Sequence, residues 1–181
     1  MVISIQEILD RGIFQNRDFG EGEGLVEPEG AAIDIRVGEI WEMDQKSEAF
    51  LKKVTRKTRD YKKVAEFTPG KDESFMLEPM KYYQFKSVES VAVPNDLVAR
   101  FVARYNLLAN GIMVLAYKAD PGYEGTMAVP IINLSGVPFE IELGARFGQF
   151  EFHEIKGEGV AYRGQWKGDR VFTEDGEEVQ V

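Results

Sequence analysis

The 181-residue chain contains no cysteine and a single histidine, His153. The absence of cysteine excludes disulfide bonds, thiolate nucleophiles and zinc–thiolate sites, and it is typical of a reducing cytoplasm. One histidine excludes multi-histidine zinc sites and most histidine-based triads. Carboxylates are therefore the acid–base groups that we expect if the chain performs chemistry.

Positive charge and long apolar runs are also scarce. The 31 acidic residues outnumber the 22 basic ones, and the net charge is −9. Binding to a phosphate backbone needs an excess of Lys and Arg on one face, so we expect no nucleic-acid partner. No run approaches the roughly 18 apolar residues of a membrane span, and no leader pattern is visible. We expect a cytoplasmic protein with no membrane partner. The charge still allows a small anionic substrate that binds in a local basic pocket.

The length and the 44% apolar content predict one domain over residues 1–181. Near the N-terminus, Ser4 and Glu7 have the spacing of a capping box, and Gly12 stands where a helix C-terminal glycine belongs. This pattern predicts one short helix. Residues 18–30 are rich in glycine and keep no periodicity, which indicates a loop.

From residue 31 onward, short apolar runs are separated by Gly and Pro, which is typical of a β-barrel or β-sandwich. In 137–143 apolar residues alternate with Glu140 and Glu142, so one face of that strand is predicted to be core. We interpret residues 153–181 as a polar tail. The predicted strands are 32–37, 39–43, 74–77, 82–85, 98–102, 111–117, 127–134, 139–143 and 148–152.

Residues 52–63 hold seven basic residues in an otherwise acidic chain. One interpretation is a solvated hairpin or loop. The other is a basic lid over phosphates or a partner surface, because concentrated positive charge raises local anion occupancy. Trp166 likewise has two interpretations, an anchor that packs the tail or a side chain that touches ligand.

Four blocks, in this order, resemble the motifs of the superfamily that contains the trimeric dUTP pyrophosphatases and the dCTP deaminases. A further segment, residues 162–165, is similar to the C-terminal segment with which the deaminases cover bound nucleotide. The resemblance implies an all-β distorted barrel or jelly roll of the dUTPase-like β-clip type with a short N-terminal helix. It also implies a homotrimer with sites at subunit junctions. The blocks are residues 30–38, 93–107, 111–125 and 144–152.

The third block is the most specific, because it contains the run from Asp120 through Pro121 and Gly122 to Tyr123. Such a run alone is an ordinary turn, but within the resemblance Asp120 is the residue that activates water. Tyr123 would pack on deoxyribose, and the hairpin 111–119 would read the base through its backbone.

The remaining site residues also follow from the resemblance. Arg104, Asn106, Gln149 and Arg163 would hold phosphates, Gly111 would open the base-reading hairpin, and Tyr162 and Gln165 would cover the nucleotide. Asp34 would contact a Mg²⁺ cofactor through water.

Two departures decide between the reactions. The deaminases carry a proton-relaying glutamate where this chain has Pro130, and they carry an arginine whose place here falls near Ala109. Tyr105 and Asn106 replace the small residues that normally follow Arg104, which changes how a substrate would be bound. Proline has no proton to relay. We therefore expect hydrolysis of dUTP to dUMP and pyrophosphate with Mg²⁺. The alternatives are dCTP deamination through another relay, such as Glu124, and a non-catalytic nucleotide-binding or regulatory protein.

Overall fold

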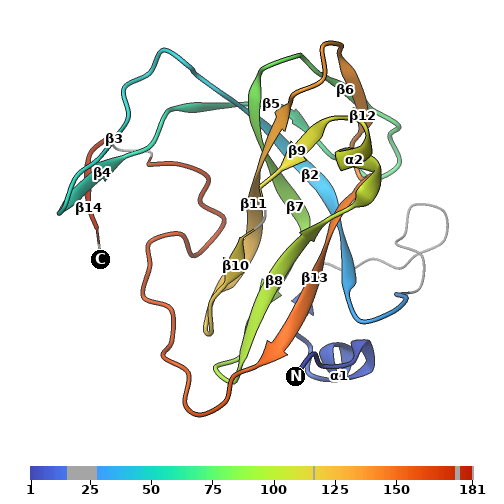
Figure 1. Ribbon diagram of the computed structural model, residues 1–181, viewed down its shortest axis with the longest axis vertical. Helices are drawn as coiled ribbons and strands as arrows, with labels where there is room; N and C mark the ends of the chain where they lie inside the picture. Colours follow the sequence, from blue (N-terminus) through green and yellow to red (C-terminus); the bar gives the residue numbers. More distant parts are fainter. Residues whose placement is uncertain (16–27, 116, 174–175, 181) are drawn as a thin grey trace.

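The computed structural model describes residues 1–15, 28–115, 117–173 and 176–180, and this part of the chain is mostly strand (Figure 1). Its helices are α1 (Ile5–Asp10) and α2 (Tyr105–Ala109). Neither described helix is long and apolar enough to cross a membrane. The strands are β1 (Phe14–Gln15), β2 (Ile33–Met43), β3 (Phe50–Leu51), β4 (Thr55–Lys57), β5 (Tyr61–Glu66), β6 (Ser74–Leu77), β7 (Tyr82–Ala92), β8 (Leu97–Ala103), β9 (Ile112–Val114), β10 (Lys118–Ala119), β11 (Glu124–Asn133), β12 (Phe139–Glu142), β13 (Arg146–Glu154) and β14 (Glu178–Val179).

Nine strands form one curled antiparallel sheet with the central order β10-β8-β13-β2-β7-β11-β9. β1 pairs with β7, and β5 pairs with β2. A second, two-stranded sheet joins β12 to β6. The sheet curls around a core of aromatic and branched side chains, so the predicted all-β fold of the dUTPase-like type is confirmed (Figure 1).

The predicted N-terminal helix is confirmed as α1. The Ser4 side chain accepts a hydrogen bond from the Glu7 backbone at 3.2 Å, as a capping residue does. Ile8 is fully buried and fixes the helix against the sheet. The predicted loop 18–30 lies mainly outside the described residues.

The two strands predicted at 32–37 and 39–43 form the single strand β2, which is irregular at Gly38. A Cβ at Gly38 would lie 2.9 Å from the backbone nitrogen of Val88, so a side chain cannot fit where β2 crosses β7. The glycine that suggested a break is therefore a site of close backbone approach.

β7 extends seven residues beyond the predicted end at residue 85. The prediction stopped there because Ser87 and Glu89 occupy inward positions that apolar residues normally fill. The structure compensates with a buried ion pair, in which Arg36 Nε lies 2.6 Å from Glu89. Arg36 also donates a backbone hydrogen bond to the same carboxylate at 2.8 Å. Burial raises the pKa of Glu89, and the bonds from Arg36 oppose that effect.

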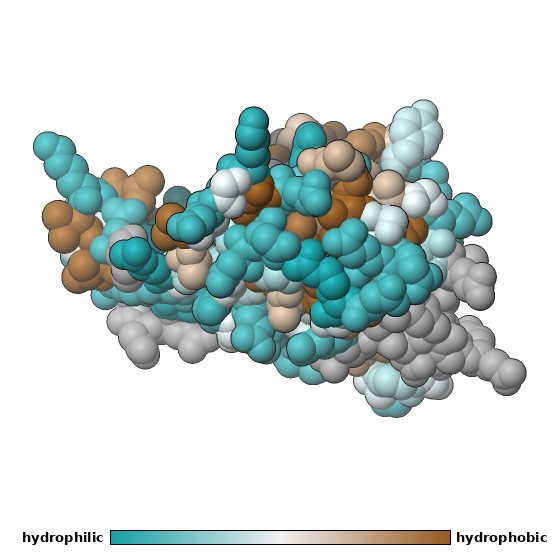
Figure 2. Space-filling view, turned by 90° about the horizontal axis from the view of Figure 1, so that it is seen from below, coloured by the Kyte–Doolittle hydropathy of each residue, from teal (hydrophilic) through white to brown (hydrophobic). Residues whose placement is uncertain are grey.

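The basic segment 52–63 contains β4 and the start of β5. A small sheet with the order β14-β4-β3 joins this segment to the end of the tail. Seen from below, this small sheet stands at the left of the molecule with apolar side chains at its tip (Figure 2). Leu51, Val54 and Val179 are 60–77% exposed there. β3 and β4 pair as a hairpin whose turn lies in this segment, but residues 55–59 are half-buried rather than solvated.

We expect Glu89→Ala to lower the free energy of unfolding by about 3–5 kcal/mol, because it removes the buried carboxylate that balances the Arg36 charge. Urea denaturation monitored by circular dichroism measures the change. Glu140→Ala is the matched control, since this strand glutamate faces solvent, and its effect should stay within about 0.5 kcal/mol. Equal losses in the two variants would contradict the role of the buried pair.

Candidate active site

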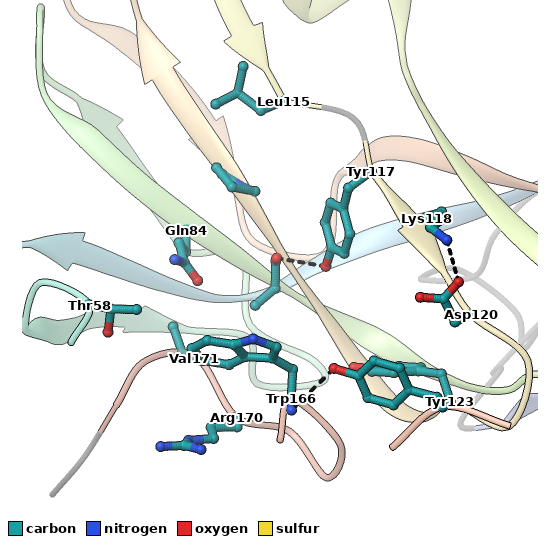
Figure 3. A pocket seen from close by; sticks show the side chains of 13 residues that line it. Thr58, Gln84, Leu115, Tyr117, Lys118, Asp120, Tyr123, Trp166, Arg170 and Val171 are labelled. Atoms are coloured by element: carbon teal, nitrogen blue, oxygen red, sulfur yellow. Dashed lines mark hydrogen bonds and ion pairs between the residues drawn. The ribbon is translucent and has the colours of Figure 1, made fainter. Parts of the chain in front are cut away.

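A cavity of about 500 Å³ lies on the outer face of β7 and β11. Inward side chains of these strands, such as Phe85 and Val129, are fully buried in the core. The intervening residues Gln84, Ala128 and Pro130 point the other way and form the cavity floor. Residues between β9 and β11 and the tail supply the walls (Figure 3). The predicted hairpin over 111–119 does not form, because β9 pairs with β11 whereas β10 pairs with β8. The remaining lining residues are Thr58, Leu115, Tyr117, Lys118, Asp120, Tyr123, Tyr162, Trp166, Arg170 and Val171.

Asp120 stands at the edge of this cavity on a tight turn. The Tyr123 backbone donates to the Asp120 carbonyl at 3.0 Å, and Gly122 has a φ of 73°. Pro121 followed by a glycine with positive φ is the pattern of a type II turn. Lys118 Nζ lies 2.5 Å from the Asp120 carboxylate (Figure 3). The turn therefore presents a carboxylate and an ammonium group side by side.

Tyr123 and Tyr162 form one aromatic wall of the cavity. Their rings pack edge to face with centroids 5.8 Å apart. Burial raises the pKa of Tyr123, so its phenol keeps its proton and donates to the Thr126 carbonyl at 2.6 Å. The Tyr162 backbone donates to the Pro121 carbonyl at 2.6 Å, which fastens the tail to the turn that carries Asp120.

The tail is held over the cavity by a cluster at Trp166. The guanidinium groups of Arg56 and Arg170 lie 4.7 and 5.2 Å from the centre of the Trp166 indole. Glu178 accepts from Arg56 at 2.6 Å and from Arg170 at 2.5 Å. Gln165 accepts from Arg56 at 2.8 Å. The Glu178 carboxylate thus joins the basic segment 52–63 to the tail. Trp166 both anchors the tail and lines the cavity.

A second polar cluster lies on the outer face of β2, β13 and β8. Arg104 Nη1 donates to one Asp34 oxygen at 2.6 Å, and Arg146 Nη1 donates to the other at 3.1 Å. Gln149 is directly opposite Asp34 in the β2–β13 register and opposite Val102 in β8. Three residues predicted for the site, Asp34, Arg104 and Gln149, are therefore brought together.

This second cluster is distant from Asp120 within one chain. Ala119, which precedes Asp120, pairs with Ala99, and Arg104 lies five residues further along the β8 direction. At the rise of an extended strand, five residues span about 17 Å. That distance is well beyond the hydrogen-bond reach within which groups act on one reacting atom.

The other predicted residues divide between these regions. Asn106 is exposed in α2, and Gly111 lies in the turn after it, so both lie with the Arg104 cluster. Arg163 is exposed and does not line the cavity, whereas Gln165 contacts Arg56. The predicted residues that line the cavity are Asp120, Tyr123 and Tyr162.

Sequence reasoning missed Gln84, Lys118 and Arg170 as lining residues. The alternation of β7 places Gln84 on the outer face, but its position opposite Pro130 depends on the strand register. Lys118 stands two residues before Asp120, which was a usable signal. Arg170 reaches the cavity because the tail folds back, and no local pattern indicates that.

A curled antiparallel sheet whose tail closes a cavity beside an Asp-Pro-Gly-Tyr turn has the features of the predicted superfamily. Residues 5–155 match the family model described as dCTP deaminase-like, and the chain belongs to that family. The dCTP deaminase of Halorubrum lacusprofundi is similar, with 29% identity across 97% of this chain and 88% of the relative. The "dCTP deaminase, dUMP-forming" of Dictyoglomus thermophilum has 25% identity across 83% and 77%.

One solved structure gives the same picture of the fold. The crystal structure of a 2′-deoxycytidine 5′-triphosphate deaminase from Agrobacterium tumefaciens aligns with a TM-score of 0.60 and 16% identity over 83% of this chain. The alignment covers 47% of that longer chain. The predicted membership in the dUTPase/dCTP deaminase superfamily is confirmed.

The Glu178 contacts generate a prediction for the tail. Burial acts to raise the pKa of Glu178, but hydrogen bonds from Arg56 and Arg170 outweigh it and hold the pKa below its ordinary value of 4.5. A depressed carboxylate pKa stabilises the folded form above that value, and the contribution is lost as the pH falls below it. Closure of the tail should therefore weaken below pH 4.5.

We expect Glu178→Gln to speed amide hydrogen exchange at Tyr162 and Gln180 severalfold at pH 7, because both arginines lose their carboxylate. In the natural chain the protection of the same amides, corrected for intrinsic exchange, should fall on acidification below pH 4.5. Glu158→Gln is the control, since Glu158 is an exposed tail residue. Unchanged protection in Glu178→Gln would show that other contacts hold the tail.

Proposed function

We propose that the chain hydrolyses a pyrimidine deoxynucleoside triphosphate, dUTP first, to the monophosphate and pyrophosphate. The observation that carries the proposal is that Asp120 is the one carboxylate among the described residues that line the cavity. Pro130 lies on the cavity floor at the position of the family's relay glutamate and supplies no proton. A single carboxylate can activate a water molecule for hydrolysis by accepting its proton.

In this reaction Asp120 accepts a proton from a water molecule while the water oxygen attacks the α-phosphorus, which stays with the nucleoside. The bond from that phosphorus to the bridging oxygen breaks, and pyrophosphate leaves with the bond's electron pair. Lys118, next to the carboxylate, and Arg170, on the opposite wall, are cations that stabilise charge on the phosphates. Tyr123 and Tyr162 form an apolar wall against which a deoxyribose packs.

Mg²⁺ fits this scheme as an ion carried by the substrate phosphates. The described residues contain no group of three or more His, Cys, Asp or Glu side chains that would form a protein cage. Both oxygens of Asp34 already accept from arginines, which disfavours direct ligation there. Mg²⁺ commonly uses few protein ligands and several phosphate oxygens. Bound in this way, it would reduce the negative charge on the phosphates that opposes the approach of the attacking water.

The names of the relatives support both this reaction and a second candidate. A dUMP-forming dCTP deaminase must remove pyrophosphate as well as the amine, so phosphate-chain hydrolysis fits the family. The second candidate is deamination of dCTP, favoured because these curated relatives are named for it. The relay would then fall to Asp120, because Glu124 does not line the cavity.

We also propose that the protein acts as a homotrimer in which one chain's Arg104 cluster completes the cavity of another. The supporting observation is the separation of Asp120 from Arg104 within one chain. Exposed apolar residues follow Arg104 on α2 and on the neighbouring β9, β11 and β12 ends, which lie close together in the fold (Figure 1). Burial of such residues stabilises association. They are Tyr105, Leu108, Met113, Leu134 and Val137, which are 43–78% exposed.

We expect Asp120→Asn to slow dUTP hydrolysis by about 10²–10⁴-fold, because an amide cannot accept the proton of the attacking water. Release of pyrophosphate and of ammonia from dUTP, dCTP and dTTP with Mg²⁺ measures the reaction and separates hydrolysis from deamination. Glu124→Gln is the control and should keep the natural rate. Equal rates for Asp120→Asn and the natural chain would contradict the mechanism. A natural chain that binds these nucleotides and turns over none would favour a regulatory protein.

Mixing two inactive variants tests the shared site. Asp120→Asn and Arg104→Gln chains are each expected to be inactive alone. After joint refolding, about a quarter of the junctions should combine an intact Asp120 with an intact Arg104, and activity should return. Light scattering gives the oligomeric state, and each variant refolded alone is the control. No recovery in mixed trimers would mean that one chain supplies both groups.

A further inference from the structure

Gln84 has an unusual place on the cavity floor. It pairs directly with Pro130 across β7 and β11, so the two side chains stand next to each other on the outer face. Ala128 and Pro130, the other floor residues, have no hydrogen-bonding side chain. Gln84, labelled in Figure 3, therefore carries a polar group beside Pro130, which stands where the family's relay glutamate would be.

Three hydroxyl groups that line the cavity already form hydrogen bonds within the protein. Tyr117 donates to the Ala128 carbonyl at 2.8 Å, and Tyr123 donates to the Thr126 carbonyl at 2.6 Å. The Thr58 hydroxyl accepts from the Thr173 backbone at 2.9 Å. Among the described lining residues, Gln84 has the one side-chain amide, which presents a donor and an acceptor at neighbouring atoms.

The Gln84 amide lies next to the Tyr61 hydroxyl. Burial raises the pKa of Tyr61, and the neighbouring Gln84 amide acts against that rise. The amide carries two N–H donors and one acceptor oxygen, more than a single neighbour can use. Tyr61 does not line the cavity, so it leaves the ligand's space free.

We propose that Gln84 is a specificity-determining residue that hydrogen-bonds the polar edge of the pyrimidine base of a bound deoxynucleoside triphosphate. The inference rests on the proposed function for the class of ligand. A pyrimidine carries adjacent donors and acceptors on one edge, and an amide matches such an edge. Because the rest of the floor is apolar, a base seated there without this partner would bury unsatisfied polar atoms.

Calorimetric titration with the non-hydrolysable α,β-imido analogues of dUTP and dCTP tests the proposal. Gln84→Leu should weaken binding of the preferred analogue by about tenfold to a hundredfold, because a buried base edge loses its partner. Binding of tripolyphosphate, which has no base, should not change. Gln84→Glu offers acceptors only, so it should shift the affinity ratio at least about tenfold toward the 4-amino base over the 4-oxo base.

Tyr61→Phe is the matched control, since it removes the hydroxyl next to Gln84 but keeps the amide. It should retain binding of both analogues within a few fold. Analogue affinities in Gln84→Leu within twofold of the natural chain would overturn the inference while leaving the proposed function intact. Gln84-dependent binding without any turnover would contradict the proposed function alone, and no binding by the natural chain would contradict both.

Discussion

The contact of Glu178 with Arg56 and Arg170 joins the end of the tail to the basic segment 52–63, and the closed cavity is built on this join together with the Tyr162–Pro121 hydrogen bond. Without the tail, the outer face of β7 and β11 would be an ordinary solvated sheet face, because the core already packs on the inner face. Buried charged groups stabilise a structure only when their geometry is good and their hydrogen bonds are satisfied. Here two guanidinium groups share one carboxylate and enclose the Trp166 indole. The tail then becomes the second wall of a cavity that β-strands alone do not make.

The floor of that cavity limits the chemistry. A proline at position 130 can line a pocket but cannot move a proton, and its missing N–H also weakens the strand pairing. The carboxylate that remains among the described lining residues is Asp120, at the edge, next to Lys118. In the proposed reaction Asp120 would take the proton of the attacking water, and Lys118 would stand beside it as a cation for the phosphates. That role needs no proton-carrying group at position 130, which is why we propose hydrolysis first.

Local patterns in the sequence predicted the elements that local physics determines. The Ser4 cap and the turn at Gly122 depend on residues a few positions apart, and both occur in the structure. The alternation over 137–143 predicted β12, although Val137 itself is exposed. The predicted strand ends too early at residue 85, because the burial of Glu89 in β7 depends on its ion pair with Arg36, 53 residues away in the sequence. Among the predicted site residues, Asp120 and Tyr123 in the turn and Tyr162, which bonds to the turn, line the cavity. Asp34 and Gln149 are instead brought next to Arg104 by the pairing of strands far apart in the sequence.

Closure of the cavity and completion of the proposed site are separate equilibria. The Glu178 contacts lie within one chain, so the tail closes independently of protein concentration. In the proposed homotrimer, the Arg104 cluster would reach another chain's Asp120 only by association, which depends on concentration. A dilute monomer would therefore keep a closed cavity with the aromatic wall and Gln84 on its floor, and it would lack the second phosphate cluster. Base recognition would then persist where catalysis is lost, because the groups for these two tasks lie on different parts of the sheet.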